Sequence, residues 1–375
     1  MKPLSILYYS INNKRKLISM LISLGFSVAL IYSLQFLIDE IKHSNDFTSL
    51  NPMKCYSEVV KKGDEPIPDA IIQSILKNET TEKVLPRIRQ YTFYMPAVGR
   101  NGVSVFSLEQ EDMTYLMKRL DLHLSKGTLP KDGTNEAVID VRLAKNKHLK
   151  IGDKIGYEVN EKELFIRGTY VIVGFINGNS MLMLTARQDQ MNDSEIYRDS
   201  MIVFPKEGKS QESEAFLQTL PKQIVDCFTY QTAYNAQAKD TKDLKRYINE
   251  LVIMLIIVLS ISTGNASYIN TFQRRYEFAL LYSVGYSSLQ ILKKLMNEIF
   301  FINILGYIAG MLLSLLLAGI EYLVVFEPNG LVLRLMLPNA LLQTLAIPVF
   351  TSLFCIIPVS IMLRKIDPIR VIEGE

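Results

Sequence analysis

The sequence has few residues that carry chemistry: no tryptophan, three histidines and three cysteines among 375 residues. The histidines, His43, His123 and His148, match no metal-binding spacing. The chain contains neither a phosphate-binding P-loop pattern nor a serine-nucleophile turn, so it cannot be its own P-loop ATPase. We expect no catalytic residue, no metal site and no directly bound cofactor.

Charge is nearly balanced as well. The chain has 41 Lys and Arg against 38 Asp and Glu, a net charge of +3 that gives no indication of nucleic-acid binding. Hydrophobic residues, in contrast, make up 49% of the sequence. They gather in four stretches with no Asp, Glu, Lys or Arg inside, each close to the ~20 residues that cross a bilayer as a helix. These are Leu17–Ile38, Leu251–Thr271, Ile299–Ile320 and Ala340–Leu363.

With their interfacial residues, the predicted spans cover 17–38, 247–271, 295–320 and 340–363. The first is too long for the apolar part of a cleaved signal peptide, and no small-residue cleavage site follows it. Basic residues concentrate in 1–16, 272–294 and 364–375, so these segments, and both termini, are predicted to face the cytoplasm. The segments 39–246 and 321–339 then lie outside a bacterial plasma membrane.

The interiors of the predicted spans contain no Asp, Glu, Lys or Arg that could mark a path for a substrate or a proton. Glu250 and Glu298 lie at span ends, where interfacial anchoring is the simpler interpretation. Four-residue spacing places Gly306, Gly310, Ser314 and Ala318 along one side of the third span. Such a stripe allows close helix packing. The pattern leaves open whether it packs within the chain or forms a dimer seam.

The outer segment has the pattern of an α+β domain. Strands are predicted at 54–60, 84–95, 137–140, around Gly168 in 165–175, and at 224–230 beside the first strand; helices are predicted at 68–77, 112–124 and, capped by Asp140, 141–146. Residues 236–246 would extend the second span outward. Cys55 and Cys227, near the two ends, could form a disulfide or remain buried thiols, and Cys355 lies in the fourth span. Residues 1–16 suggest an amphipathic helix on the membrane surface, or else a disordered tail.

The most informative segment joins the second and third spans. It reads Thr-Phe-Gln-Arg-Arg-Tyr-Glu-Phe-Ala-Leu-Leu-Tyr-Ser-Val-Gly from Thr271 to Gly285. Phe272, Tyr276, Ala279, Leu280 and Ser283 can form one helical face, Gly285 ends the helix, and Ser287 or Ser288 can cap the next. A charged helix between two spans suggests a contact with a soluble partner. The alternative is an interfacial loop whose arginines only set topology.

Several motifs along the chain resemble the FtsX/MacB family of ABC-transporter permeases. The Arg275-x-Glu277-x-Ala-Leu-Leu-x-Ser-Val-Gly285 segment is followed by Glu298 and Gly306-x-x-x-Gly310. Asn13-Lys14-Arg15, Glu136–Asp140, Leu149–Ile155 and the Asp367-Pro368-Ile-Arg370 ending are similar to other parts of the family pattern, in the same order. Phe278 and Ala279 stand where Ile-Gly is usual, and Tyr282 where a basic residue is common.

The resemblance implies a four-helix permease with an α+β extracytoplasmic domain, working as a dimer with a second copy or a paralogue. A separate ABC ATPase would supply ATP and Mg and dock on a coupling helix within 272–294. The implied contact residues are Arg275, Glu277, Leu280 and Gly285. Hydrolysis would move the outer domain through the spans, an action called mechanotransmission. The outer domain would comprise a porter part, 49–107 and 198–234, with 108–197 inserted.

Three functions compete on the sequence. The favoured one is export or extraction of a peptide, lipopeptide, lipoprotein or amphiphilic drug. The second is a signalling complex in which the outer domain activates a cell-wall hydrolase. The third, a membrane-anchored enzyme or sensor, is disfavoured by the poor catalytic inventory.

Overall fold

The computed structural model describes residues 14–187, 193–331 and 338–365. The chain divides into two compact units. The helical unit comprises Met1–Ile38, Leu244–Glu321 and Arg334–Glu375, and the α+β domain comprises Asp39–Asp243 and Tyr322–Leu333. Residues 1–13 and 366–375, including most of the predicted N-terminal helix and the C-terminal motif, lie outside the described residues.

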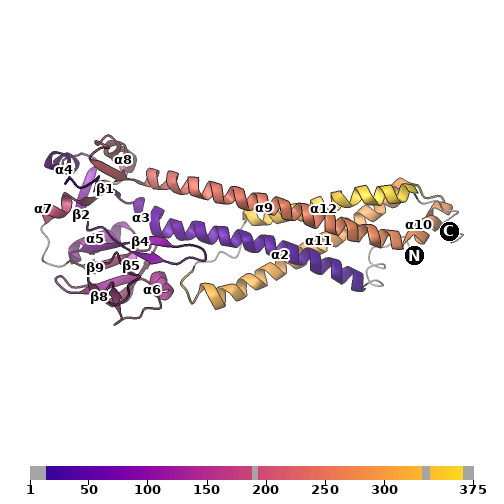
Figure 1. Cartoon of the computed structure of the whole chain (residues 1–375), viewed down its shortest axis with the longest axis horizontal. Helices are drawn as coiled ribbons and strands as arrows, with labels where there is room; N and C mark the ends of the chain where they lie inside the picture. The colour runs from indigo at the N-terminus through magenta and orange to yellow at the C-terminus, as the bar shows by residue number, and fades with distance from the viewer. Residues whose placement is uncertain (1–13, 188–192, 332–337, 366–375) are drawn as a thin grey trace. The chain divides into compact units, whose positions relative to one another are not determined.

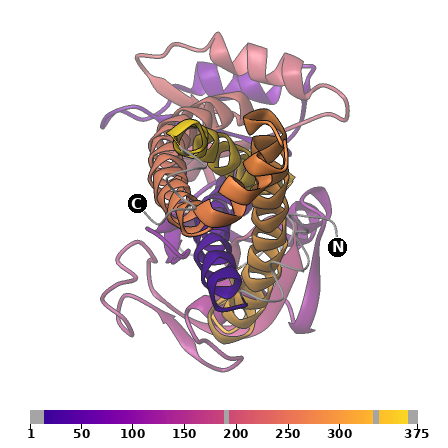
Figure 2. The same cartoon turned by 90° about the vertical axis from the view of Figure 1, so that its right-hand side faces the viewer.

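The helical unit contains four helices that are long and apolar enough to cross a membrane, as the sequence predicts. They are α2 (Lys14–Asn45), α9 (Tyr230–Gln273), α11 (Ser288–Glu321) and α12 (Pro338–Lys365). A short helix, α10 (Arg275–Ser283), lies between α9 and α11. Figure 2 views this unit along its helices with α10 in front, and Figure 1 shows α9 as one uninterrupted helix. The predicted helical extension of the second span is therefore present.

The α+β domain begins with an antiparallel four-stranded sheet in the order β11-β1-β10-β2. Its strands are β1 (Ser57–Lys61), β2 (Thr81–Pro86), β10 (Ser200–Pro205) and β11 (Val225–Phe228). The last strand pairs with the first, Cys227 opposite Val59, as the sequence predicts. Helices α4 (Asp69–Leu76) and α8 (Ser210–Gln218) bury apolar residues against one face.

A mixed seven-stranded sheet forms the rest of the domain, with the path β3-β4-β9-β6-β8-β5 and β7 paired to β8. Its elements are β3 (Gln90–Tyr94), β4 (Asn101–Leu108), α5 (Gln110–Arg119), β5 (Leu122–Gly127), β6 (Glu136–Asp140), α6 (Val141–Asn146), β7 (Lys154–Gly156), β8 (Thr169–Gly178) and β9 (Met183–Ala186). The short helix α7 (Asp193–Tyr197) leads back to β10. Asp140 caps α6 as predicted, because its Oδ1 accepts a bond from the Arg142 amide at 2.8 Å.

Two boundaries differ from the sequence-based prediction. Residues 84–95 are not one strand: β2 belongs to the four-stranded sheet and β3 to the seven-stranded sheet. The chain thus passes from the four-stranded to the seven-stranded sheet between Pro86 and Gln90. The helix predicted at 112–124 ends at Arg119, because Asp121 adopts a positive φ of 53°, and β5 follows.

The two sheets share one apolar core. Leu85, Ile202 and Phe204 of the four-stranded sheet cluster with Phe106 and Leu184 of the other, and α5 adds Met113 and Leu116. Tyr56 lies in this cluster with 3% of its surface exposed. The opposite face of the four-stranded sheet packs on α4 and α8. The sheets are therefore joined by buried side chains as well as by the chain itself.

Candidate functional site

The helix α10 has well-defined ends. At its C-terminus Gly285 adopts a φ of +97°, and the Tyr286 amide donates to the Leu281 carbonyl at 3.0 Å. This left-handed glycine ends the helix as the sequence predicts. The next helix begins with a reciprocal cap: the Ser287 amide donates to Gln290 Oε1 at 3.0 Å, and Ser287 Oγ accepts from the Gln290 amide at 3.4 Å. The segment is a structured helix–turn–helix rather than a slack loop.

One side of α10 is buried. Phe278 and Ala279 have no exposed surface. Phe278 clusters with apolar residues of α11 and α12, among them Ile291, Leu295 and Val359. Tyr282 donates from its hydroxyl to the Leu363 carbonyl of α12 at 3.2 Å. Phe278, Ala279 and Tyr282 thus all lie on the side of α10 that packs against the other helices.

A buried ion pair fixes the start of α10. Arg274, at the break between α9 and α10, places Nη1 at 3.0 and 3.1 Å from the two carboxylate oxygens of Glu298. Its Nε also donates to Glu277 Oε2 at 3.0 Å. The Arg274 and Glu298 side chains are only 9% and 7% exposed, so each charge depends on the other for the solvation that it lacks.

This pair was not predicted. The sequence singled out Glu298 as an interfacial anchor and Arg275 and Glu277 as partner contacts, but not Arg274. A signal did exist, since a carboxylate at the start of a span needs a cation, and two arginines stand in the preceding segment. Only the geometry shows which of the two turns inward.

The opposite side of α10 is exposed and apolar. Tyr276, Leu280 and Val284 are 49%, 59% and 77% exposed. The Arg275 guanidinium lies 4.8 Å from the Phe272 ring centroid and 5.6 Å from that of Tyr276, so it covers part of the same surface. The prediction that Ala279 belongs to this exposed face is wrong, because Ala279 is buried. We call Phe272, Arg275, Tyr276, Leu280 and Val284 the α10 surface.

The glycine stripe of the third span packs within the chain. Gly306, Gly310, Ser314 and Ala318 are all buried on α11. A Cβ placed on Gly310 would lie 2.7 Å from Val28 Cβ and 2.8 Å from the Gly25 carbonyl oxygen. One on Gly306 would meet Leu24 at 3.0 Å. Of the two readings left open by the sequence, the structure has the intrachain contact between α2 and α11.

The loop between the third and fourth spans belongs to the α+β domain, although the sequence treated it as a separate element. Its described part is a π-helical turn, η2 (Tyr322–Phe326), continuing to Leu331. The Tyr94 hydroxyl donates to the Gly330 carbonyl at 3.1 Å, and Asn146 Nδ2 donates to the Asn329 carbonyl at 3.0 Å. Lys145 pairs with Glu327. Phe326 and Leu331 join the core around β6 and α6.

Cys55 and Cys227 are free thiols in the structure, unlike the disulfide considered from sequence. Cys55 packs against the core shared by the two sheets, whereas Cys227 packs on the α4–α8 side. The four-stranded sheet therefore separates them. Burial raises the pKa of both thiols, that of Cys227 to about 11.

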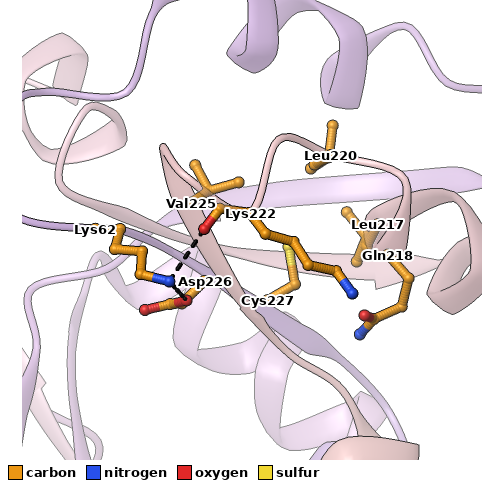
Figure 3. Close-up of a pocket in the computed structure, with 8 residues that line it drawn as sticks. All are labelled: Lys62, Leu217, Gln218, Leu220, Lys222, Val225, Asp226 and Cys227. Carbon is orange, nitrogen blue, oxygen red and sulfur yellow. Dashed lines mark hydrogen bonds and ion pairs between the residues drawn. The ribbon is translucent and has the colours of Figure 1, made fainter.

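Cys227 lines a small pocket of about 210 Å³, which Figure 3 shows with Lys62 between Asp226 and the Lys222 backbone. Lys62 Nζ lies 3.4 Å from Asp226 Oδ1 and donates to the Lys222 carbonyl at 3.1 Å. This volume is below the ~300 Å³ usual for ligand pockets, and two of its charged side chains, Lys62 and Asp226, are paired with each other. Within the described part of the chain, no group of three or more His, Cys, Asp or Glu side chains could hold a metal ion.

Comparison with known proteins supports the resemblance seen in the sequence. Residues 251–368 match the family model described as FtsX-like permease C-terminal, a range that contains α10 and α11. A comparison with curated proteins gives no significant match.

Among solved structures, the chain is similar to the periplasmic region of MacB from Actinobacillus actinomycetemcomitans, at 10% identity and a TM-score of 0.30, over 49% of this chain and 92% of the other. It is also similar to the extracellular domain of the noncanonic ABC-type transporter YknZ from Gram-positive bacteria, at 10% identity and a TM-score of 0.28, over 47% and 99%.

Proposed function

We propose that this chain is the permease subunit of an ABC transporter of the FtsX/MacB type, in which α10 is the coupling helix for a separate ATPase. Permeases of this family work with such ATPases and are not themselves the enzyme. The α10 segment and both termini then face the cytoplasm, and the α+β domain lies outside. ATP and Mg bind in the partner, and a second permease, identical or paralogous, completes a dimer.

The observation that supports this role is the two-sided character of α10. Its inner side is locked to α11 and α12 by Phe278 and by the Arg274–Glu298 pair. Its outer side leaves Leu280 59% exposed beside Tyr276 and Val284. An apolar surface on a rigidly held helix is what a docking partner needs, because force applied there reaches the spans without first deforming a loop.

The action on the substrate follows the same logic. The helices α2 and α9 continue beyond their apolar spans into the segments that enter the α+β domain, and the α11–α12 loop is part of that domain. Movement of α2, α9 or α11 would therefore be transmitted to the domain, an action called mechanotransmission. The substrate would be an exported or extracted peptide, lipopeptide, lipoprotein or amphiphilic drug. A signalling complex that activates a cell-wall hydrolase is the alternative.

Leu280→Arg tests the coupling helix more cleanly than a change at Glu277, because Glu277 accepts a hydrogen bond from Arg274 and its replacement would also alter that pairing. We expect an ABC ATPase to co-purify with the wild-type chain from gently solubilised native membranes and to be lost with Leu280→Arg. Leu280→Met, which keeps size and apolarity, is the matched control and should retain it. An ATPase bound equally by all three chains would remove α10 as its docking site; no ATPase with any of them would refute the permease role.

The proteins and ligands that co-purify in the same experiment distinguish transport from signalling. A second permease with a bound amphiphile would support transport, whereas a cell-wall hydrolase held by the α+β domain would support signalling.

A further inference from the structure

The seven-stranded sheet leaves aromatic side chains partly exposed at the edge formed by β3, which pairs with β4 alone along the described sheet path. Strand alternation buries Gln90, Thr92 and Tyr94 and turns Tyr91 and Phe93 to the other face. Phe165, from the loop 157–168, stacks on Tyr91 with ring centroids 4.2 Å apart and planes at 19°. It also meets Phe93 edge-on at 5.9 Å. We call Tyr91, Phe93, Leu164 and Phe165 the aromatic edge.

The loop that carries Phe165 buries an acidic side chain and exposes apolar ones. Its acidic residue Glu163 is 4% exposed, accepts a bond from Thr92 Oγ1 at 2.6 Å and pairs with Lys147. Its apolar residues Leu164 and Phe165 are instead 63% and 41% exposed. Loops of soluble domains normally show the reverse arrangement. Buried polar anchors thus hold two large apolar side chains in water.

A further anchor makes the arrangement rigid. The Arg167 amide donates to Gln90 Oε1 at 2.8 Å, and Gln90 is itself 2% exposed on β3. Ile166, between the anchors, is 1% exposed. The aromatic edge is therefore preorganised, and a ligand would meet it without ordering the loop first.

Positive charge lies at the same surface. The Arg100 guanidinium is 4.7 Å from the Phe93 ring centroid, and its residue is exposed. No ion pair found among the described residues includes Arg100. Within the loop, the carboxylate of Glu158 accepts a bond from Thr169 Oγ1 at 2.8 Å, and Glu161 is exposed. A cation over a partly buried ring, outside any ion pair of the described residues, complements an anionic group carried on an apolar ligand.

We propose that the aromatic edge binds an anionic amphiphile, whose acyl chain lies on Tyr91, Leu164 and Phe165 and whose phosphate or carboxylate pairs with Arg100. This rests on the proposed function and narrows its substrate to one chemical class. An anionic lipid and an acylated acidic peptide share the required chemistry.

The absence of tryptophan from the chain allows a direct test. Leu164→Trp places a single indole at an exposed position of the full-length protein, reconstituted in zwitterionic nanodiscs without ATPase. We expect lysophosphatidylglycerol, or palmitoylated triglutamate, to shift its emission to the blue saturably, at least about fivefold more tightly than lysophosphatidylcholine. The tighter of the two anionic probes identifies the source.

Two variants in the reporter background complete the design. Arg100→Glu should weaken the anionic probes about fivefold and leave lysophosphatidylcholine unchanged, and Phe165→Ser should weaken all three. Lys206→Glu, an exposed cation outside the seven-stranded sheet, should change nothing. Unaltered thermal unfolding of each variant shows that the domain folds.

Equal binding of lysophosphatidylcholine, or no effect of Arg100→Glu, would refute recognition of an anion. No saturable shift with any probe would refute the site. None of these three results depends on ATPase co-purification, so none of them would by itself refute the permease role.

Discussion

Arg274 and Glu298 are individual residues on which the position of α10 depends. Both side chains are nearly buried, and a buried charge that loses its partner is strongly destabilising, whereas removal of both can be neutral. We expect Arg274→Met or Glu298→Met alone to destabilise the helical unit by about 3 kcal/mol. The double Met variant should recover most of this loss. Thermal stability of the solubilised chain, followed by the monodisperse fraction after heating, measures it.

The control is Arg246→Met, which removes a pair with Glu250 whose arginine side chain is 76% exposed. An exposed helical pair contributes only about 0.3 to 0.5 kcal/mol, so little change is expected. Equal effects at Arg246 and Arg274 would show that the inner pair does not hold α10.

The thiol of Cys227 gives a pH-dependent prediction. Its pKa of about 11, against an ordinary value of 9.0, is raised by burial first and by Asp226 second. Because the thiolate is the reactive form, alkylation at pH 8 should be roughly a hundredfold slower than that of a free thiol. The rate should climb as pH approaches 11. Since unfolding returns the pKa to its ordinary value, folding is favoured by this group below pH 9 and loses that contribution between pH 9 and 11.

Mass spectrometry after timed iodoacetamide labelling would measure this rate, with urea-unfolded chain as the reference. Rapid labelling at pH 8 in the folded state would contradict the buried environment. Mass loss of two hydrogens in an unlabelled Cys55–Cys227 peptide pair would restore the disulfide considered from sequence.

At the scale of elements, the contact between α2 and α11 depends on a missing side chain. A Cβ on Gly310 would approach Val28 Cβ and the Gly25 backbone to less than 3 Å, so Gly310→Ala must push the helices apart. We expect a loss of about 1 to 3 kcal/mol in the same heating assay. Gly319→Ala is the matched control on the same helix, since nothing lies within 4 Å of its Cβ, and it should be neutral or slightly stabilising. Indistinguishable variants would argue against this packing.

The α11–α12 loop rests on another glycine. Gly330 has a φ of +65°, and a Cβ there would lie 2.1 Å from the Arg142 carbonyl oxygen. Gly330→Ala should therefore detach the loop from α6 and speed amide hydrogen exchange in Tyr322–Leu331. Gly208→Ala has a similar φ of +76° but open space around its Cβ, so it reports backbone strain alone. Unchanged exchange in Gly330→Ala would mean that the loop is not held by these contacts.

At the scale of the whole molecule, the sequence predicted what depends on local pattern. The four spans follow from hydrophobic length, the Asp140 cap and the Gly285 helix end from single-residue chemistry, and the return of β11 to β1 from strand order. The spans, the cap and the helix end are set by residues close together in the chain, whereas β11 and β1 pair across the whole domain, Val59 opposite Cys227.

What the sequence could not predict depends on distant partners. Pro86 is a local signal that β2 ends, but only their neighbours in space assign β2 and β3 to different sheets. Arg274 and Arg275 are adjacent and chemically identical, and burial against Glu298 alone distinguishes them. Phe165 looked like part of a strand, since its apolar character suits one; it belongs instead to a loop held by Thr92 and Lys147.

The helix α9 runs without interruption over 44 residues, from directly after β11 to directly before Arg274. At about 1.5 Å per residue it is a shaft of about 66 Å, roughly twice the hydrocarbon thickness of a bilayer. A continuous helix fixes the rotation of one end about the helix axis relative to the other end, because each residue adds about 100°. If the proposed permease role holds and α9 transmits rotation, two alanines inserted between Lys242 and Asp243 should uncouple the partner's ATP hydrolysis from movement of the α+β domain. Seven alanines, which return the phase to within about 20°, should restore coupling if rotation is what the shaft conveys.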